Sequence, residues 1–187
     1  MSYLFNSRPL TWEEYEYLIQ KMDESINNPS ESQPKKVASL QTLVALGVHL
    51  GPLSNELLRI TWDQVVNVGS FTFKREQYRQ PLVLEPDLRA IIKKNYERIQ
   101  PLSKGAMILP DKTGSSQRPI AALRFNNMLK NHLEECEIEI SDPNANTLRR
   151  TFALKMWKDF NGSEEIVEVL AKELRLNKGS VIRYIQE

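Results

Sequence analysis

The sequence predicts an α+β fold that is mostly α-helical and carries one small three-stranded antiparallel sheet. Apolar residues recur at helical spacing through most of the chain, and the pattern becomes strand-like only between Val65 and Leu84. The chain has 187 residues, 41% hydrophobic and 26% charged, which suffices for one well-packed domain and is short for two. We therefore expect residues 1–187 to form a single domain.

The first part of the chain is expected to be helical. Thr11-Trp12-Glu13-Glu14 is typical of a capping box, because the threonine hydroxyl can accept from the third helical amide while Glu14 reaches back. An apolar helix over residues 37–50 should end at Gly51-Pro52, since proline disfavours helical geometry in the residue before it. Ser54 can then cap a short helix over residues 55–60.

The expected sheet and the later helices follow in order. Strands are predicted over residues 65–68, 71–74 and 80–84, with Gly69-Ser70 as a tight turn between the first two. From Pro86 onward the spacing is helical again. The predicted helices cover residues 87–98, 119–136, 147–160, 164–174 and 178 to the end of the chain.

Composition excludes several classes of function. No run of about 18 or more apolar residues is present, so no membrane span is expected, and the start of the chain has no secretory leader, so we expect a cytoplasmic protein. One cysteine, Cys136, rules out an internal disulfide and any multi-cysteine metal site. The net charge of +1 predicts weaker non-specific DNA binding than a strongly basic protein would show.

The most informative motif is Asn146-Thr147-Leu148-Arg149-Arg150-Thr151-Phe152-Ala153, followed by Arg183-Tyr184 near the end of the chain. It places an arginine at the start of a helix and a tyrosine one or two helices later, a spacing that can bring a cation and a phenol to one phosphate. This pattern resembles the catalytic domain of the tyrosine recombinase (phage integrase) family, whose signature runs His-x-Leu-Arg-His-Thr-Phe-Ala and then a nucleophilic tyrosine.

A second stretch extends the resemblance to nearly the whole chain. Residues 51–65 (GPLSNELLRITWDQV) are similar to the family box Gly-Leu-Arg-x-Ser-Glu-Leu-x-x-Leu-x-Trp-x-Asp-Ile. The resemblance implies an integrase catalytic-domain-like fold. The helical core-binding domain that family members usually carry upstream is expected to be absent.

The resemblance also implies a reaction without metal or other cofactor, in which a tyrosine attacks a DNA phosphodiester and forms a 3′-phosphotyrosyl link. Tyr184 then matches the nucleophile, Arg149 the second arginine and Lys74 the lysine of the small sheet. Positive donors are needed there because charge develops on the phosphate. The structural alternatives are a tyrosine packed against the last helix, an arginine in a surface ion pair and an exposed hairpin lysine.

Three positions depart from the family pattern. Leu53 stands at the first arginine, Asn146 at the first histidine and Arg175 at the second histidine or tryptophan. Leucine can hold no charge, and losing comparable donors lowers rates by roughly 10² to 10⁵. Asn146 can still donate to a phosphate oxygen but cannot titrate near neutral pH, and Arg175 is a candidate replacement cation.

Further cations follow Arg149 on the same predicted helix. Arg150, Lys155 and Lys158 could lie along a DNA backbone. Equally, Arg150 with Lys158 and Asp159 could form an ordinary solvated face. We therefore expect double-stranded DNA as the partner, with self-association into a homo-oligomer on DNA as a further possibility.

The resulting interpretation is a DNA-binding integrase-like protein of a mobile element, associated with site-specific recombination or integration, whose catalytic set is incomplete and whose activity is weak or lost. Two alternatives stay open. One is an active DNA breaking and rejoining enzyme. The other is a non-enzymatic module that uses the same fold to bind or regulate another protein.

Overall fold

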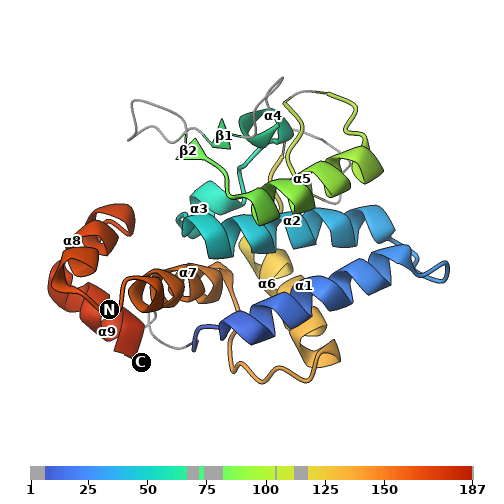
Figure 1. The fold of residues 1–187 in the computed structure, drawn as a ribbon. Coiled ribbons are helices and arrows are strands. Elements are labelled where there is room, and N and C mark those ends of the chain that lie inside the picture. Colours follow the sequence, from blue (N-terminus) through green and yellow to red (C-terminus); the bar gives the residue numbers. More distant parts are fainter. Residues whose placement is uncertain (1–6, 67–71, 74–81, 104, 112–117, 187) are drawn as a thin grey trace.

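The computed structural model describes residues 7–66, 72–73, 82–103, 105–111 and 118–186, and this part of the chain is mostly helical (Figure 1). In chain order the elements are α1 (Trp12–Asn27), α2 (Pro34–Leu50), α3 (Ser54–Leu57), α4 (Trp62–Val65), β1 (Thr72–Phe73), β2 (Leu82–Val83), α5 (Pro86–Ile99), α6 (Ala122–Glu135), α7 (Ala145–Asp159), α8 (Glu164–Glu173) and α9 (Lys178–Gln186). No helix among these residues is long and apolar enough to cross a membrane.

The first two helices begin and end through local signals. Thr11 caps α1 with the expected box: its side chain accepts from the Glu14 amide, and the Glu14 carboxylate accepts from the Thr11 amide at 2.8 Å. Helix α2 starts at Pro34, three residues before the predicted start, because proline fits the first helical turn. It ends as predicted, with Gly51 in the left-handed conformation at φ 58°.

The predicted sheet is found only in part. β1 and β2 pair antiparallel, with Thr72 opposite Val83 and Phe73 opposite Leu82. The prediction that Val65 opens a first strand is wrong, since Val65 is the last residue of α4, where the Gln64 side chain accepts from the Thr61 amide at 2.8 Å. Residues 67–71 lie outside the described part of the chain, so a three-stranded sheet is not confirmed.

Helix α2 is the centre of the molecule. Twelve of its 17 residues are buried, so that it is apolar around most of its circumference. Helices α1, α5 and α7 all pack on it, with α1 and α5 on opposite sides (Figure 1). This arrangement makes α2 the scaffold against which the other helices are positioned.

The buried apolar side chains form two clusters. The larger, which we name the main core, runs from Leu10 to Leu148 and includes α1, α2, α5 and α6. The smaller, named the C-terminal core, consists of Phe152, Ala153, Ile166, Val167, Leu170, Leu174, Val181, Tyr184 and Ile185. Helix α7 contributes to both, because Leu148 belongs to the first and Phe152 to the second.

Two glycines, Gly47 in α2 and Gly51 directly after it, allow α7 to approach closely. A Cβ at Gly47 would lie 2.8 Å from Leu148 Cδ1, and one at Gly51 would lie 2.4 Å from Phe152 Cδ1. Neither distance is sterically allowed, so glycine is needed at both positions for this packing.

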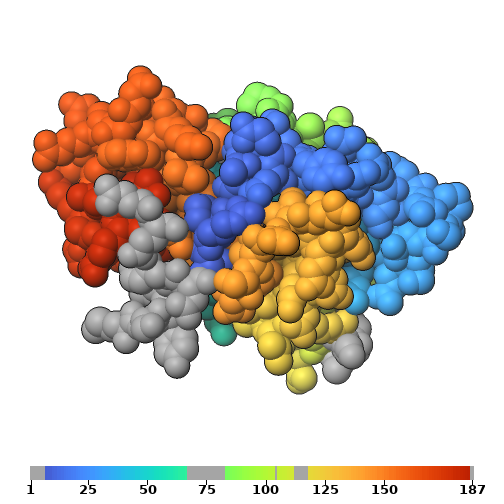
Figure 2. Space-filling view, turned by 90° about the horizontal axis from the view of Figure 1, so that it is seen from below, coloured from blue at the N-terminus to red at the C-terminus, as the bar shows by residue number. Residues whose placement is uncertain are grey.

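The segment that leads into α1 runs between distant parts of the chain. In Figure 2 it appears in dark blue between the C-terminal helices, in orange and red, and the stretch that follows α6, in amber. Arg8 Nε donates to the Glu139 carbonyl oxygen at 3.0 Å on one side, and Ser7 Oγ lies 2.5 Å from Thr147 Oγ1 on the other. The start of the described chain is therefore held against the start of α7.

Candidate active site

The start of α7 is fixed by a cap. The Asn144 side chain accepts from the Asn146 amide at 2.8 Å, and Thr147 Oγ1 accepts from the Asn144 amide at 3.0 Å. These bonds hold Asn146 in the first turn, where helix amides and the helix dipole favour an anion.

The phenol of Tyr184 reaches this first turn from α9. Its hydroxyl donates to Asn146 Oδ1, and the side chain is almost completely buried, with 2% of the residue exposed. Burial raises the pKa of Tyr184 above its usual value, while the nearby guanidinium groups of Arg149 and Arg150 act in the opposite direction. The phenol is therefore held neutral in this conformation.

Arg149 approaches the same place from the body of α7. It is buried, at 6% exposed, and its guanidinium donates to the carbonyl oxygen of Leu174 at the end of α8. Its charge acts on the Tyr184 phenol. Three of the residues singled out from the sequence, Tyr184, Asn146 and Arg149, thus lie together at the seam between α7, α8 and α9.

Arg150 lies inside the protein rather than on a solvated face. It is fully buried, and it donates from Nε to the Tyr184 carbonyl oxygen at 3.2 Å and from Nη1 to the Ser7 carbonyl oxygen at 2.6 Å. Its Cζ atom is 5.5 Å from the centroid of the Tyr184 ring, a cation–π distance. A side chain enclosed in this way cannot lie along a DNA backbone, so the surface position expected for Arg150 is not where the structure places it.

Arg175 and Leu53 are linked through a residue that the sequence reasoning missed. Arg175 Nη2 lies 2.8 Å from Glu56 Oε1, and Glu56 Oε2 accepts from the Leu53 amide at 3.0 Å. Arg175 directly follows Leu174, whose carbonyl holds Arg149. The sequence prediction of Ser54 as the cap was wrong: Leu53 is the cap residue of α3, and Glu56, three residues later, binds its amide as a capping glutamate commonly does.

The remaining predicted cations are on or near the surface. Lys155 Nζ pairs with Asp159 Oδ2 at 2.7 Å and lies 5.0 Å from the centroid of the Trp12 ring. Lys158 is exposed and lies within electrostatic range of Glu13. Lys74 lies outside the described residues. In the part of the chain that is described, no group of three or more His, Cys, Asp or Glu side chains could hold a metal ion.

Fold comparisons define the class to which this architecture belongs. The helices are arranged as in tyrosine recombinases, which confirms at the level of fold the resemblance stated from the sequence. No protein-family model matches the sequence, and the comparison with curated proteins gave no match.

The particular structures are site-specific recombinases. The XerH recombinase bound to difH substrate in a pre-cleavage complex superposes with a TM-score of 0.68 at 14% identity over 96% of this chain and 50% of its own. XerA recombinase superposes with a TM-score of 0.68 at 11% identity over 96% of this chain and 58% of its own. A lambda integrase dimer bound to a COC′ core site superposes with a TM-score of 0.59 at 14% identity over 96% of this chain and 59% of its own. This chain therefore spans about half to three-fifths of the length of these proteins.

Proposed function

We propose that this protein is a DNA-binding, tyrosine recombinase-like domain that acts in site-specific recombination or integration, with weak or lost DNA cleavage of its own. One observation carries the proposal. The phenol of Tyr184, the amide of Asn146 and the guanidinium of Arg149 lie together at the first turn of α7. The DNA-bound recombinases that share the fold support DNA as the partner.

A phosphate is the ligand that suits this place. The first turn of α7 offers the positive end of the helix dipole, although Asn144 already accepts from the amides of Asn146 and Thr147. Arg149 now donates to a neutral carbonyl, that of Leu174. A phosphate oxygen makes a stronger, charge-assisted partner for a guanidinium, so an incoming DNA backbone can compete for Arg149.

Arg175 is the candidate for a second cation beside the phosphate. Its side chain is 46% exposed and follows the residue that holds Arg149. Its pairing with Glu56, which also binds the amide of Leu53, supports a role for Arg175 near the position where the family has its first arginine. We assign Arg175 the role of compensating in part for the leucine at that position.

Weak or lost cleavage follows from the groups around the phenol. Tyr184 must give up its proton as its oxygen bonds to phosphorus, and Asn146, which holds the hydroxyl, is not a base. The phenol is also buried, so it must move or be uncovered before it can meet a phosphate. Leu53 supplies no charge to the transition state.

DNA binding is tested by fluorescence anisotropy with a labelled duplex at several salt concentrations. Affinity should fall as salt rises, because phosphate contacts release counterions. Arg175→Ala should weaken binding on all sequences and lower the salt slope by about 1. Lys130→Ala, at an exposed lysine on α6, is the matched control and should change neither quantity.

Absence of binding at low salt would contradict the proposal and favour the protein-binding module instead. An Arg175→Ala variant with unchanged salt dependence would leave DNA binding in place but remove Arg175 from the site.

Cleavage is tested separately by covalent trapping on a nicked duplex. The wild-type protein should give little or no protein–DNA adduct, and any adduct should vanish in Tyr184→Phe. The double variant Leu53→Arg with Asn146→His restores two family positions and should raise the adduct yield if the pocket is otherwise intact. A high yield from the wild-type protein would instead establish the active enzyme.

A further inference from the structure

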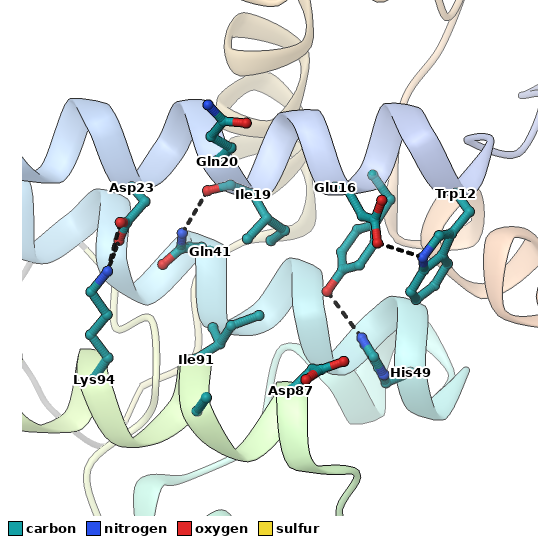
Figure 3. Close-up of a pocket in the computed structure, with 12 residues that line it drawn as sticks. Trp12, Glu16, Ile19, Gln20, Asp23, Gln41, His49, Asp87, Ile91 and Lys94 are labelled. Carbon is teal, nitrogen blue, oxygen red and sulfur yellow. Dashed lines mark hydrogen bonds and ion pairs between the residues drawn. The ribbon is translucent and has the colours of Figure 1, made fainter.

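A groove of about 510 Å³ lies between α1, α2 and α5 (Figure 3). Helices α1 and α5 form its two walls, and α2 forms its floor. Ile19 and Ala90 with Ile91 provide apolar surface on the two walls. The volume falls in the range that small organic ligands occupy.

Both ends of the groove are closed by side-chain bridges. At one end His49 Nε2, on α2, lies 3.1 Å from Tyr15 Oη, and His49 Nδ1 lies 2.9 Å from Oε2 of Glu85, the residue before α5. At the other end the Asp23 carboxylate, on α1, lies 2.6 Å from Lys94 Nζ and 2.9 Å from Arg98 Nη1. Asp23 lies eight residues after Tyr15 on α1, which corresponds to about 12 Å of helix.

These bridges decide what kind of occupant fits. A helix or an extended peptide running along the groove would have to break one of them. A compact molecule with a length of about 10 Å fits between them without moving either. These bridges therefore favour a small molecule over a segment of a partner protein.

The end of the groove near Trp12 is aromatic. The Trp12 and Tyr15 ring centroids are 4.9 Å apart, and the His49 ring is 5.5 Å from the first and 5.6 Å from the second. The Trp12 indole N–H donates to Glu16 Oε1 at 2.8 Å, and Lys155 of α7, which does not line the groove, has its ammonium 5.0 Å from the Trp12 ring centroid. The Trp12 ring therefore already has one cation in range, and the Tyr15 ring, which also lines the groove, offers a further π surface for a ligand cation.

The charged side chains that line the groove also favour a positively charged ligand. Glu16, Asp23 and Asp87 line the groove together with the ammonium of Lys94, and the Arg98 guanidinium also pairs with Asp23, so the carboxylates exceed these cations by one. Lys94 is paired with Asp23 at the far end, so the excess lies at Glu16 and Asp87, on the two walls beside the aromatic rings (Figure 3). Burial lowers the pKa of His49, so this imidazole adds no positive charge near neutral pH.

We propose that this groove binds a small organic cation, with an ammonium or amidinium head beside Trp12 and Tyr15, flanked by Glu16 and Asp87, and an apolar body on Ile19 and Ile91. A phosphate would be repelled by the same carboxylates, so the site is separate from the proposed DNA face. It does not depend on the proposed recombinase-like function.

The test uses benzamidinium as the probe and benzamide, its uncharged isostere, as the control ligand. Binding is read from the indole N–H signal of Trp12, identified as the signal that Trp12→Phe removes. Benzamidinium should shift this signal in a saturable way, and benzamide should bind roughly fivefold more weakly or not at all.

Two variants assign the charge selectivity to the groove. Asp87→Asn should weaken benzamidinium binding by roughly threefold to fivefold and leave benzamide unchanged. Glu97→Gln removes an exposed carboxylate from the same helix outside the groove and should leave both ligands unchanged. Both positions are exposed, and a thermal melt of each variant checks that it is folded.

Three results would overturn the proposal. One is the lack of any saturable shift at millimolar benzamidinium. Another is equal affinity for benzamide, which would mean that charge is not recognised. The third is an Asp87→Asn variant, folded as shown by its melt, that binds benzamidinium as tightly as the parent.

Discussion

The main core and the C-terminal core are built on different principles, although α7 runs through both. The main core surrounds α2, whose buried positions cover most of the helix, and holds together through apolar packing from several sides. The C-terminal core is a small cluster on α7, α8 and α9. Around its junction with the rest lie buried polar and charged side chains, among them Arg149, Arg150, Thr147 and Thr151.

This difference indicates which part of the molecule opens first. A small apolar cluster tied on by hydrogen bonds contributes less burial per residue than a core that encloses a helix, so its local opening costs less free energy. The proposed nucleophile, Tyr184, belongs to the weaker part. A buried phenol can therefore be released without unfolding the main core.

Truncating one leucine in each core tests most directly whether the two cores open independently. Leu43 on α2 and Leu170 on α8 are both buried, and each change to alanine should cost about 3 kcal/mol of local stability. Leu43→Ala should lower the free energy of global unfolding. Leu170→Ala should speed amide hydrogen exchange in α8 and α9 and leave α1 and α2 protected. Equal loss of protection in all four helices would show that the two cores unfold as one unit.

The second prediction concerns the contact between α2 and α7. Gly51→Ala should destabilise the protein by about 2–3 kcal/mol, because φ is +58° and the new methyl group would lie against the Phe152 ring. Denaturant unfolding measures the change. Gly105→Ala is the control, since a Cβ there would meet nothing within 4 Å, and it should be close to neutral. Similar losses in the two variants would contradict the close-packing argument.

The third prediction concerns the seam itself. Arg150→Met should cost about 2 kcal/mol, because the carbonyl oxygens of Ser7 and Tyr184 lose a buried donor. The Leu10 amide, which donates to Thr151 beside this site, should exchange faster. Arg183→Met, on the exposed side of α9, is the control and should leave exchange at Leu10 unchanged. Unchanged exchange in Arg150→Met would show that the arginine does not hold the seam.

The smallest predicted effect compares one buried tyrosine from each core. Burial raises the pKa of both Tyr15 and Tyr184, so above about pH 10 the unfolded chain loses a phenol proton that the folded chain keeps. Stability should not respond to these groups below that pH and should fall above it, by about 1 kcal/mol per group per pH unit. Urea unfolding at about pH 8 and pH 10.5 measures the decline.

Tyr15→Phe and Tyr184→Phe should each make this alkaline decline less steep, and Tyr17→Phe, at an exposed tyrosine, is the control. A decline that is the same in all three variants and the parent would show that neither buried phenol is responsible.

The elements that depend on local signals could be predicted from the sequence. The capping box at Thr11 and the glycine-proline stop after Leu50 both form through neighbouring residues, and both were predicted. The misassigned strand at Val65 shows the limit of this reasoning. The β-branched pair Val65-Val66 favours a strand. In the structure the cap formed by Thr61 and Gln64 prevails and starts the short helix α4, which includes Val65.

Of the candidate site, the sequence could indicate one contact but not the arrangement. It paired Tyr184 with the motif at the start of α7, and the Tyr184 hydroxyl does donate to Asn146. The burial of Arg150 could not be foreseen, because its partners, Ser7 and Tyr184, are 143 and 34 residues away along the chain. The bridge from Arg175 to Glu56 is also a contact between distant segments.

The Arg150 guanidinium donates hydrogen bonds to the carbonyl oxygen of Ser7, the first described residue, and to that of Tyr184 in α9. Loss of this one donor would therefore loosen two segments together: the residues that lead into α1 and the helix that carries the proposed nucleophile.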